Sequence, residues 1–253
     1  MKTFLFSLSL IFGSCTSLTA QYSDTTISGI PIQFKYDSNI FPAFWREKEI
    51  NATGTEISVE EIPRSKQSMI EALNKYPISL LTNNLRHVYF LKDMSFYNVS
   101  FGGTNSITNL YITNDGISYG FTNTYIEQTF HHEFSSILMR NYISKLDTAA
   151  WNAANAPGIV YTDEQGGVGA IANGESSQDI DTALCRRGIL TKYALSAMEN
   201  DLNTLAQNIF KPDEGFWNIV DTYPRIRKKV NLLIDFYHKL DPVFTKSYFR
   251  KLK

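Results

Sequence analysis

The chain has 253 residues, a formal net charge of −1, 43% hydrophobic residues and 19% charged residues. This is the composition of an ordinary globular protein with room for one sizeable domain. The nearly neutral charge argues against nucleic acid as the main partner, because binding to phosphates needs a surplus of lysine and arginine.

The first twenty residues have the features of a secretory signal. Lys2 precedes an apolar run that is too short to cross a bilayer as a stable helix, and the small residues of "GSC" follow it. Two processing outcomes stay open: lipidation at Cys15 in "FGSC", which we favour, or cleavage after Ala20 in "LTA". Both predict export to the cell envelope or beyond, and the first adds a lipid anchor in the outer or cytoplasmic membrane. Residues 21–253 are expected to form a single domain.

Strand patterns dominate the first half of this domain. Residues 22–36 alternate apolar and polar side chains, and so do runs between residues 85 and 125. Within the second region, "NDG" at residues 114–116 predicts a hairpin turn. Between the two regions, residues 64–76 predict a helix that ends at Pro77.

Helical patterns dominate the second half. Residues 126–145, 181–210 and 225–239 each predict a helix. The glycine- and asparagine-rich residues 151–177 predict a long surface loop near the site. Strands first and helices later predict an α+β fold, with an antiparallel or mixed sheet in the N-terminal half and a helical C-terminal half.

The segment "TFHHEFSSILMRNY", residues 129–142, carries the candidate chemistry. On a helix, His132 and Ser136 lie four residues apart on one face, opposite an apolar stripe. Zinc peptidases with the pattern H-E-x-x-H use two histidines at this spacing to bind zinc, and the glutamate between them is the general base. His132 and Glu133 match the first two letters of that pattern. Ser136 stands where the second histidine is needed, and a hydroxyl is a weak zinc ligand. His131 points about 100° away from His132, so it does not obviously replace the missing ligand.

Together with "GILTKYALSAMENDLNTLAQNIF" and "YPRIRKKVNLLIDFYHKLD" downstream, this segment resembles the zinc-binding metallopeptidase lipoproteins of bacterial envelopes. The resemblance covers residues 126–239. It implies a zincin-like fold, a zinc cofactor and a peptide or protein substrate, with His132 as a metal ligand and Glu133 as the catalytic base. Aligned on "YA" at residues 193–194, the ligand glutamate of the family falls at or near Asn200.

The carboxylates next to that position are Glu199 and Asp201. On a helix, Asp201 flanks the apolar stripe and Glu199 lies toward the other side, so we expect Asp201 to be the half-buried carboxylate. Asp201 could be a third metal ligand, or it could accept hydrogen bonds from the backbone, His131 or His132.

Two functions stay open from the sequence. The first is an exported metallopeptidase-like protein with an incomplete zinc site and weak or no peptidase activity. The second is a non-catalytic binding or accessory module of the cell envelope on a metallopeptidase fold.

Overall fold

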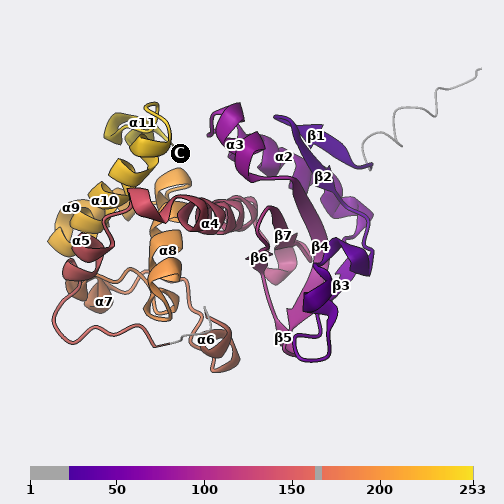
Figure 1. Cartoon of the computed structure of the whole chain (residues 1–253), viewed down its shortest axis with the longest axis horizontal. Helices are drawn as coiled ribbons and strands as arrows, with labels where there is room; N and C mark the ends of the chain where they lie inside the picture. The colour runs from indigo at the N-terminus through magenta and orange to yellow at the C-terminus, as the bar shows by residue number, and fades with distance from the viewer. Residues whose placement is uncertain (1–22, 163–166, 253) are drawn as a thin grey trace, which may run out of the picture.

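The computed structural model describes residues 23–162 and 167–252, so the predicted signal segment lies outside the described residues. Within them, a seven-stranded sheet belongs to the N-terminal half and helices make up most of the C-terminal half (Figure 1). The sheet is mixed, because β4 pairs in parallel with β2 and β7 and antiparallel with β3 and β5. The predicted α+β class with a mixed N-terminal sheet is confirmed.

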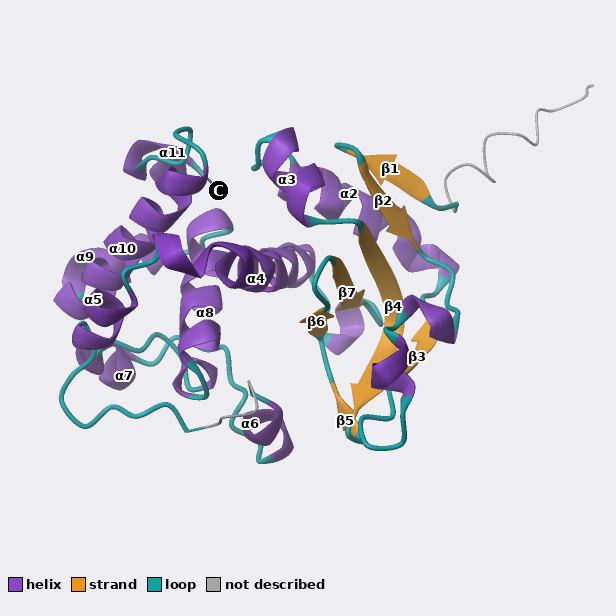
Figure 2. Cartoon of the chain, viewed as in Figure 1, coloured by secondary structure: helices purple, strands orange, loops and turns teal. Residues whose placement is uncertain are grey.

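The sheet is built around one long central strand, β4. The strand order in the sheet is β1-β2-β4-β7-β6, and β3 and β5 pair with the second half of β4 (Figure 2). The strands in chain order are β1 (Thr25–Ile27), β2 (Ile30–Gln33), β3 (Thr53–Glu56), β4 (His87–Phe96), β5 (Val99–Ser100), β6 (Gly103–Asn105) and β7 (Asn109–Thr113). The register places Tyr89 of β4 opposite Tyr111 of β7.

Both faces of the central strands are buried, because successive side chains of a strand point to opposite faces. Val88 and Phe90 of β4 belong to the main core, which also contains residues of α2 and α4. Tyr89 and Leu91, which alternate with them, belong to a second cluster with Phe41. The sheet is therefore enclosed between two apolar layers.

The helices of the described residues, in chain order, are α2 (Ile62–Leu73), α3 (Ile78–Asn84), α4 (Asn123–Tyr142), α5 (Thr148–Ala153), α6 (Val168–Ala172), α7 (Thr182–Arg187), α8 (Met198–Phe210), α9 (Phe216–Thr222), α10 (Pro224–Leu240) and α11 (Lys246–Lys251). Helix α4 lies between the sheet and the other C-terminal helices (Figure 1). Across the described part of the chain, no helix is both long and apolar enough to traverse a bilayer.

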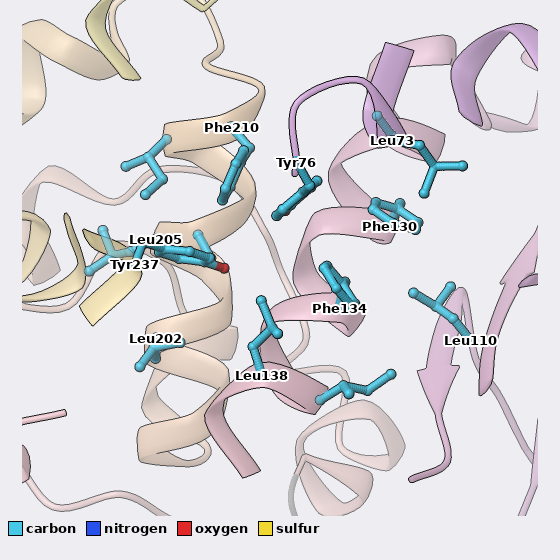
Figure 3. Packing of buried hydrophobic residues seen from close by; sticks show 14 of the residues in the cluster. Leu73, Tyr76, Leu110, Phe130, Phe134, Leu138, Leu202, Leu205, Phe210 and Tyr237 are labelled. Carbon is cyan, nitrogen blue, oxygen red and sulfur yellow. The ribbon is translucent and has the colours of Figure 1, made fainter. Parts of the chain in front are cut away.

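The main core extends through α4 into both halves of the molecule. Figure 3 shows α4, with Phe130 and Phe134, between Leu110 of β7 and the α8 side chains Leu205 and Phe210. All five side chains are fully buried. Burial of large apolar side chains is the main stabilising term in folding, at about 1.5–3 kcal/mol for each one. Helix α4 is therefore held in place from two sides.

Two local predictions are wrong. No hairpin forms at residues 114–116, because the Asn114 side chain donates to Ser65 Oγ (3.0 Å) and accepts from Arg64 (2.6 Å). These bonds anchor the chain to α2, and it continues into α4 instead of a further strand. The single helix predicted for residues 181–210 is split, since Gly188 ends α7 with a left-handed φ of 94° and α8 begins at Met198.

The predicted long loop of residues 151–177 also contains helices. Helix α5 begins at Thr148, after Asp147, whose carboxylate accepts a hydrogen bond from the backbone N–H of Ala150 (2.8 Å). Its Trp151 is fully buried. Helix α6 follows, and it lies close to β5 (Figure 1). Composition alone missed these helices because tertiary contacts order a segment of weak propensity.

Candidate functional site

Helix α4 carries the candidate residues on the face that points away from its phenylalanines. The helix is capped by Thr122, whose side chain accepts a hydrogen bond from the backbone N–H of Tyr125 (3.1 Å). His132, Ser136 and Arg140 follow one another at intervals of four residues, which places them on one face. His132 and Ser136 are nevertheless almost fully buried, at 7% and 2% exposure. Neighbouring elements therefore cover this face at His132 and Ser136, whereas Arg140 is exposed at its end.

His132 is oriented by Gln207 of α8. Its Nδ1 lies 2.8 Å from the Gln207 side-chain oxygen, and its ring lies 6.0 Å from the ring of Tyr193. An amide oxygen only accepts, so Nδ1 carries the proton and Nε2 keeps its lone pair. This is the tautomer that a metal-binding or proton-accepting histidine needs.

Glu133 lies against the edge strand β6. The Asn105 side-chain amide donates to its Oε2 at 2.7 Å. Burial raises the pKa of the Glu133 carboxyl, and the nearby His132 and the Asn105 hydrogen bond oppose the shift. The close approach depends on Gly103, where a Cβ atom would lie 2.4 Å from Thr129 Cγ2 and 3.0 Å from Glu133 Oε1. A glycine is therefore needed where β6 meets α4.

Ser136 and Glu199 are brought together, although they come from different helices. The Ser136 hydroxyl donates to a carboxylate oxygen of Glu199. Arg140 donates to Ser136 Oγ (3.2 Å), to the Asn105 side-chain oxygen (2.6 Å) and to the Ser106 carbonyl (3.0 Å). Its guanidinium also lies 4.0 Å from Glu199. We call these four side chains, Asn105, Ser136, Arg140 and Glu199, the arginine network; it joins α4, α8 and β6.

Asp201 does not face His132. It is fully buried, and its Oδ2 accepts hydrogen bonds from Trp151 (2.9 Å) and Tyr161 (2.8 Å) and forms an ion pair with Lys229 of α10. Burial raises the pKa of Asp201, and the Lys229 ammonium opposes the shift.

The geometry of α8 explains this placement of Asp201. Gln207 marks the side of α8 that faces His132, and Asp201 lies six residues earlier, about 9 Å along the axis and 120° around it. Both interpretations of Asp201 made from the sequence are therefore corrected. Its partners come from α5, α10 and the segment after α5, and they are neither a metal site nor His131 and His132.

His131 belongs to a separate buried cluster. Its Nδ1 lies 2.9 Å from the Tyr76 hydroxyl, and its Nε2 lies 3.6 Å from the Glu127 carboxylate, which also pairs with Lys75 and Lys211. Burial lowers the pKa of His131 to about 4. Burial alone would raise the pKa of Glu127, but His131 and Lys75 outweigh it and lower that pKa to about 2. His131 is thus a neutral structural side chain at neutral pH.

A cavity of about 260 Å³ opens beside His132 and Glu133. Its walls come from residues 100–103, from α4, from the α6 region, from Tyr193 and from Gln207 of α8. Among the described residues, Glu133 is the only carboxylate that lines it, and no lysine or arginine does. The cavity is therefore a mixed polar and aromatic site with one acidic group.

No three His, Cys, Asp or Glu side chains converge as a metal site within residues 23–162 and 167–252. Of the predicted candidates, His132 and Glu133 line the cavity, Ser136 and Glu199 meet in the arginine network, and His131 and Asp201 lie elsewhere. Asn105, Arg140 and Gln207 were missed. Arg140 could have been found from its spacing, four residues after Ser136, whereas Asn105 and Gln207 carry no sequence signal.

Comparison with known proteins supports the fold. No family model and no curated protein matches the sequence. One solved structure, of a "putative zinc-binding metallo-peptidase" from Bacteroides caccae ATCC 43185, is 13% identical to this chain, with a TM-score of 0.57. The match covers 96% of this chain and 95% of that one. This chain therefore shares its overall fold with that structure.

Proposed function

We propose that this protein is a non-catalytic, polypeptide-binding module of the cell envelope, built on a metallopeptidase fold. The observation that carries the proposal is the arginine network. It binds Ser136, which stands at the position of the second ligand in the resembled family, to Glu199, one of the two carboxylates next to the expected third position at Asn200. The proposal combines this arrangement with a cavity that is open beside His132 and Glu133.

The donor set of the described residues does not fit a three-ligand zinc site. Such a site needs three donors from histidine, cysteine or carboxylate side chains, and no three of these converge among the described residues. Within the described part of the chain, His132 is the one histidine that lines the cavity, and the Glu199 carboxylate is bonded to Ser136. The Ser136 hydroxyl is a weak ligand and is already bonded to Glu199. The Arg140 guanidinium, 4.0 Å from Glu199, supplies the positive charge that a metal would bring and repels a second cation. We therefore derive no catalytic step through zinc.

Metal analysis and a proteolysis assay test this proposal together. We expect the purified protein to contain far less than one zinc per chain, to bind unfolded casein and to leave it intact. Stoichiometric zinc that is lost in His132→Ala but kept in the control His87→Ala, with cleavage of casein, would overturn the proposal. Failure to bind casein at all would overturn the polypeptide-binding part of it.

A second candidate function is a zinc-dependent peptidase of low activity. Gln207 holds His132 in the tautomer that leaves Nε2 free to accept, and Glu133 keeps the position of the general base. Casein cleavage that requires both Glu133 and added zinc would favour this function.

Export to the envelope is part of the proposal and is supported by the sequence of residues 1–20. We expect the protein to be recovered in the membrane fraction and to take up labelled fatty acid. Loss of the label in Cys15→Ala would support lipidation. A protein that is released without label would support cleavage after Ala20.

A further inference from the structure

We propose that the cavity beside Glu133 binds a primary ammonium group, supplied by the amino terminus or a lysine side chain of a polypeptide. This inference rests on the proposed function and names the chemistry that the cleft would recognise. It follows from the ion pairing of three of the four carboxylates on α4 and α8, from the aromatic lining of the cavity, and from the size of the cavity.

Glu127 and Asp201 are the buried carboxylates of α4 and α8, whereas Glu133 is half-buried and lines the cavity. Glu127 pairs with Lys75 and Lys211, and Asp201 pairs with Lys229. Charges taken out of water are normally paired in this way, because an unpaired buried charge is costly.

Glu133 is the exception among these three. Within the described part of the chain it forms no ion pair, and a neutral amide, that of Asn105, donates to its Oε2. Arg140, the nearest guanidinium on the same helix face, is bonded to Asn105, Ser106 and Ser136 instead. Because Glu133 lines the cavity, a cation inside the cavity could supply the missing partner.

The rest of the cavity lining is aromatic and mostly uncharged. Phe101, Tyr125 and Tyr193 contribute aromatic rings to the cavity wall, and the remaining side chains are mostly neutral amides and hydroxyls. Aromatic faces attract cations, and a carboxylate combined with aromatic rings is a favourable environment for an ammonium group. An anionic ligand such as a phosphate or a peptide carboxylate would find no lysine or arginine among the described lining residues.

The size of the cavity limits what the ligand can be. A cavity of about 260 Å³ admits one side chain or one chain terminus, and it excludes a folded domain. A polypeptide that projects a single ammonium group into the cavity while the rest of it lies outside satisfies this limit. A free amino terminus and a lysine side chain share this chemistry, and the experiment separates them.

Calorimetric titration with four small probes at pH 7 tests the inference. The probes are Gly-Gly-Gly-amide, which has only an amino terminus, N-acetyl-Gly-Lys-Gly-amide, its norleucine analogue, and N-acetylglucosamine. We expect at least one of the two ammonium probes to bind about tenfold more tightly than the norleucine peptide, which is neutral and of similar size. The stronger of the two identifies the source of the ammonium group. A chelator in the buffer keeps the measurement independent of metal.

Two isosteric variants locate the binding site. Glu133→Gln should weaken the binding of the ammonium probe about tenfold or more, and Glu71→Gln, an exposed position on α2, should leave it unchanged. Thermal unfolding of both variants separates loss of binding from loss of folding. If Glu133→Gln fails to fold, protection of wild-type Glu133 from a carbodiimide by the ammonium probe, and not by the norleucine peptide, replaces this test.

The inference is overturned if no probe binds, if the norleucine peptide binds as tightly as both ammonium probes, or if Glu133→Gln binds like the wild type. Binding of N-acetylglucosamine that survives in Glu133→Gln would overturn it in favour of a neutral, hydroxyl-rich ligand. These failures are distinct from failure of the proposed function, because casein binding without cleavage would still stand. Zinc-dependent cleavage of casein would instead overturn the proposed function itself.

Discussion

The Ser136 hydroxyl of α4 donates a hydrogen bond to the Glu199 carboxylate of α8. This contact connects the position where a zinc-peptidase helix carries its second histidine with a carboxylate of the next buried helix. The two positions are thus close enough to bind one metal ion together, although serine is a poor metal ligand.

Ser136→His should therefore raise the affinity for zinc. The new imidazole would lie one helical turn from His132 and next to Glu199, which gives three strong donors in place of the two present in the wild type. We expect the zinc dissociation constant to fall by at least about tenfold, measured by competition with a chromophoric chelator. Ser136→Asn, which adds bulk without a good ligand, is the control. The same affinity in both variants would contradict the expectation, and so would a gain that survives Glu199→Gln.

The ion pair of Asp201 with Lys229 should be a stability element. Asp201→Asn leaves the Lys229 ammonium buried without its partner, and we expect a loss of about 3–5 kcal/mol in the free energy of unfolding, measured in urea. The double variant Asp201→Leu with Lys229→Met should recover much of that loss, because it removes both charges together. Casein binding by folded Asp201→Asn should be unchanged. A selective loss of binding without loss of stability would instead place Asp201 in the functional site.

His131 should make the protein sensitive to acid. Its pKa is lowered to about 4 in the folded protein, against an ordinary value of 6.5, so the unfolded chain binds the proton more tightly. Stability is then complete above pH 6.5 and is lost as the pH falls toward 4, with a slope approaching about 1.4 kcal/mol per pH unit. His131→Gln should flatten the stability profile between these pH values, whereas His238→Gln, at an exposed position, should not. An unchanged slope in His131→Gln would show that other groups set the acid response.

Glu127 should extend the same response to lower pH. Its folded-state pKa of about 2 lies below the ordinary 4.5, so its contribution is present above pH 4.5 and is lost as the pH falls toward 2. His131→Gln should weaken this acid limb as well, because His131 is one of the two groups that lower the Glu127 pKa. His238→Gln should leave the limb in place, as followed by circular dichroism during acid titration.

Gly103→Ala should disturb the contact between β6 and α4. The added methyl group would lie 2.4 Å from Thr129 Cγ2, which is far inside van der Waals contact. We expect a loss of about 1–3 kcal/mol in the free energy of unfolding, as for other overpacked sites. The double variant with Thr129→Ser removes Cγ2 and keeps a hydroxyl for the bond to the Tyr125 carbonyl, so it should recover part of the loss. No recovery would mean that the contact with Glu133 dominates.

The sequence predicted the order of the elements and the α4 segment well, because these depend on local periodicity. It placed Glu133 and His132 correctly in relation to one another, since their spacing is fixed by the helix. The partners of these residues, Gln207 and Asn105, were not predictable. They reach the site through tertiary packing of α8 and β6, which no pattern within a single segment encodes.

Asp201 illustrates a different limit. The apolar stripe of α8 placed this residue at a border between a buried and an exposed side, but every residue from Asn200 to Phe210 is buried. Periodicity locates one buried face and cannot describe a helix that is surrounded on all sides. Asp201 forms its ion pair with Lys229 of α10, which lies 28 residues away in the sequence. The role of Asp201 is therefore set by a tertiary contact.

The burial of α8 also has a consequence for how this protein can diverge. Its body touches neighbours in every direction, and a substitution there must be matched by another one. In its first turn, the Glu199 side chain is 44% exposed and is therefore less constrained by packing than the buried residues that follow it. Substitutions should therefore cost the least stability at the start of α8, next to Ser136. Residues of the site can therefore be substituted while the buried core stays the same. Close relatives with this fold need not share one activity.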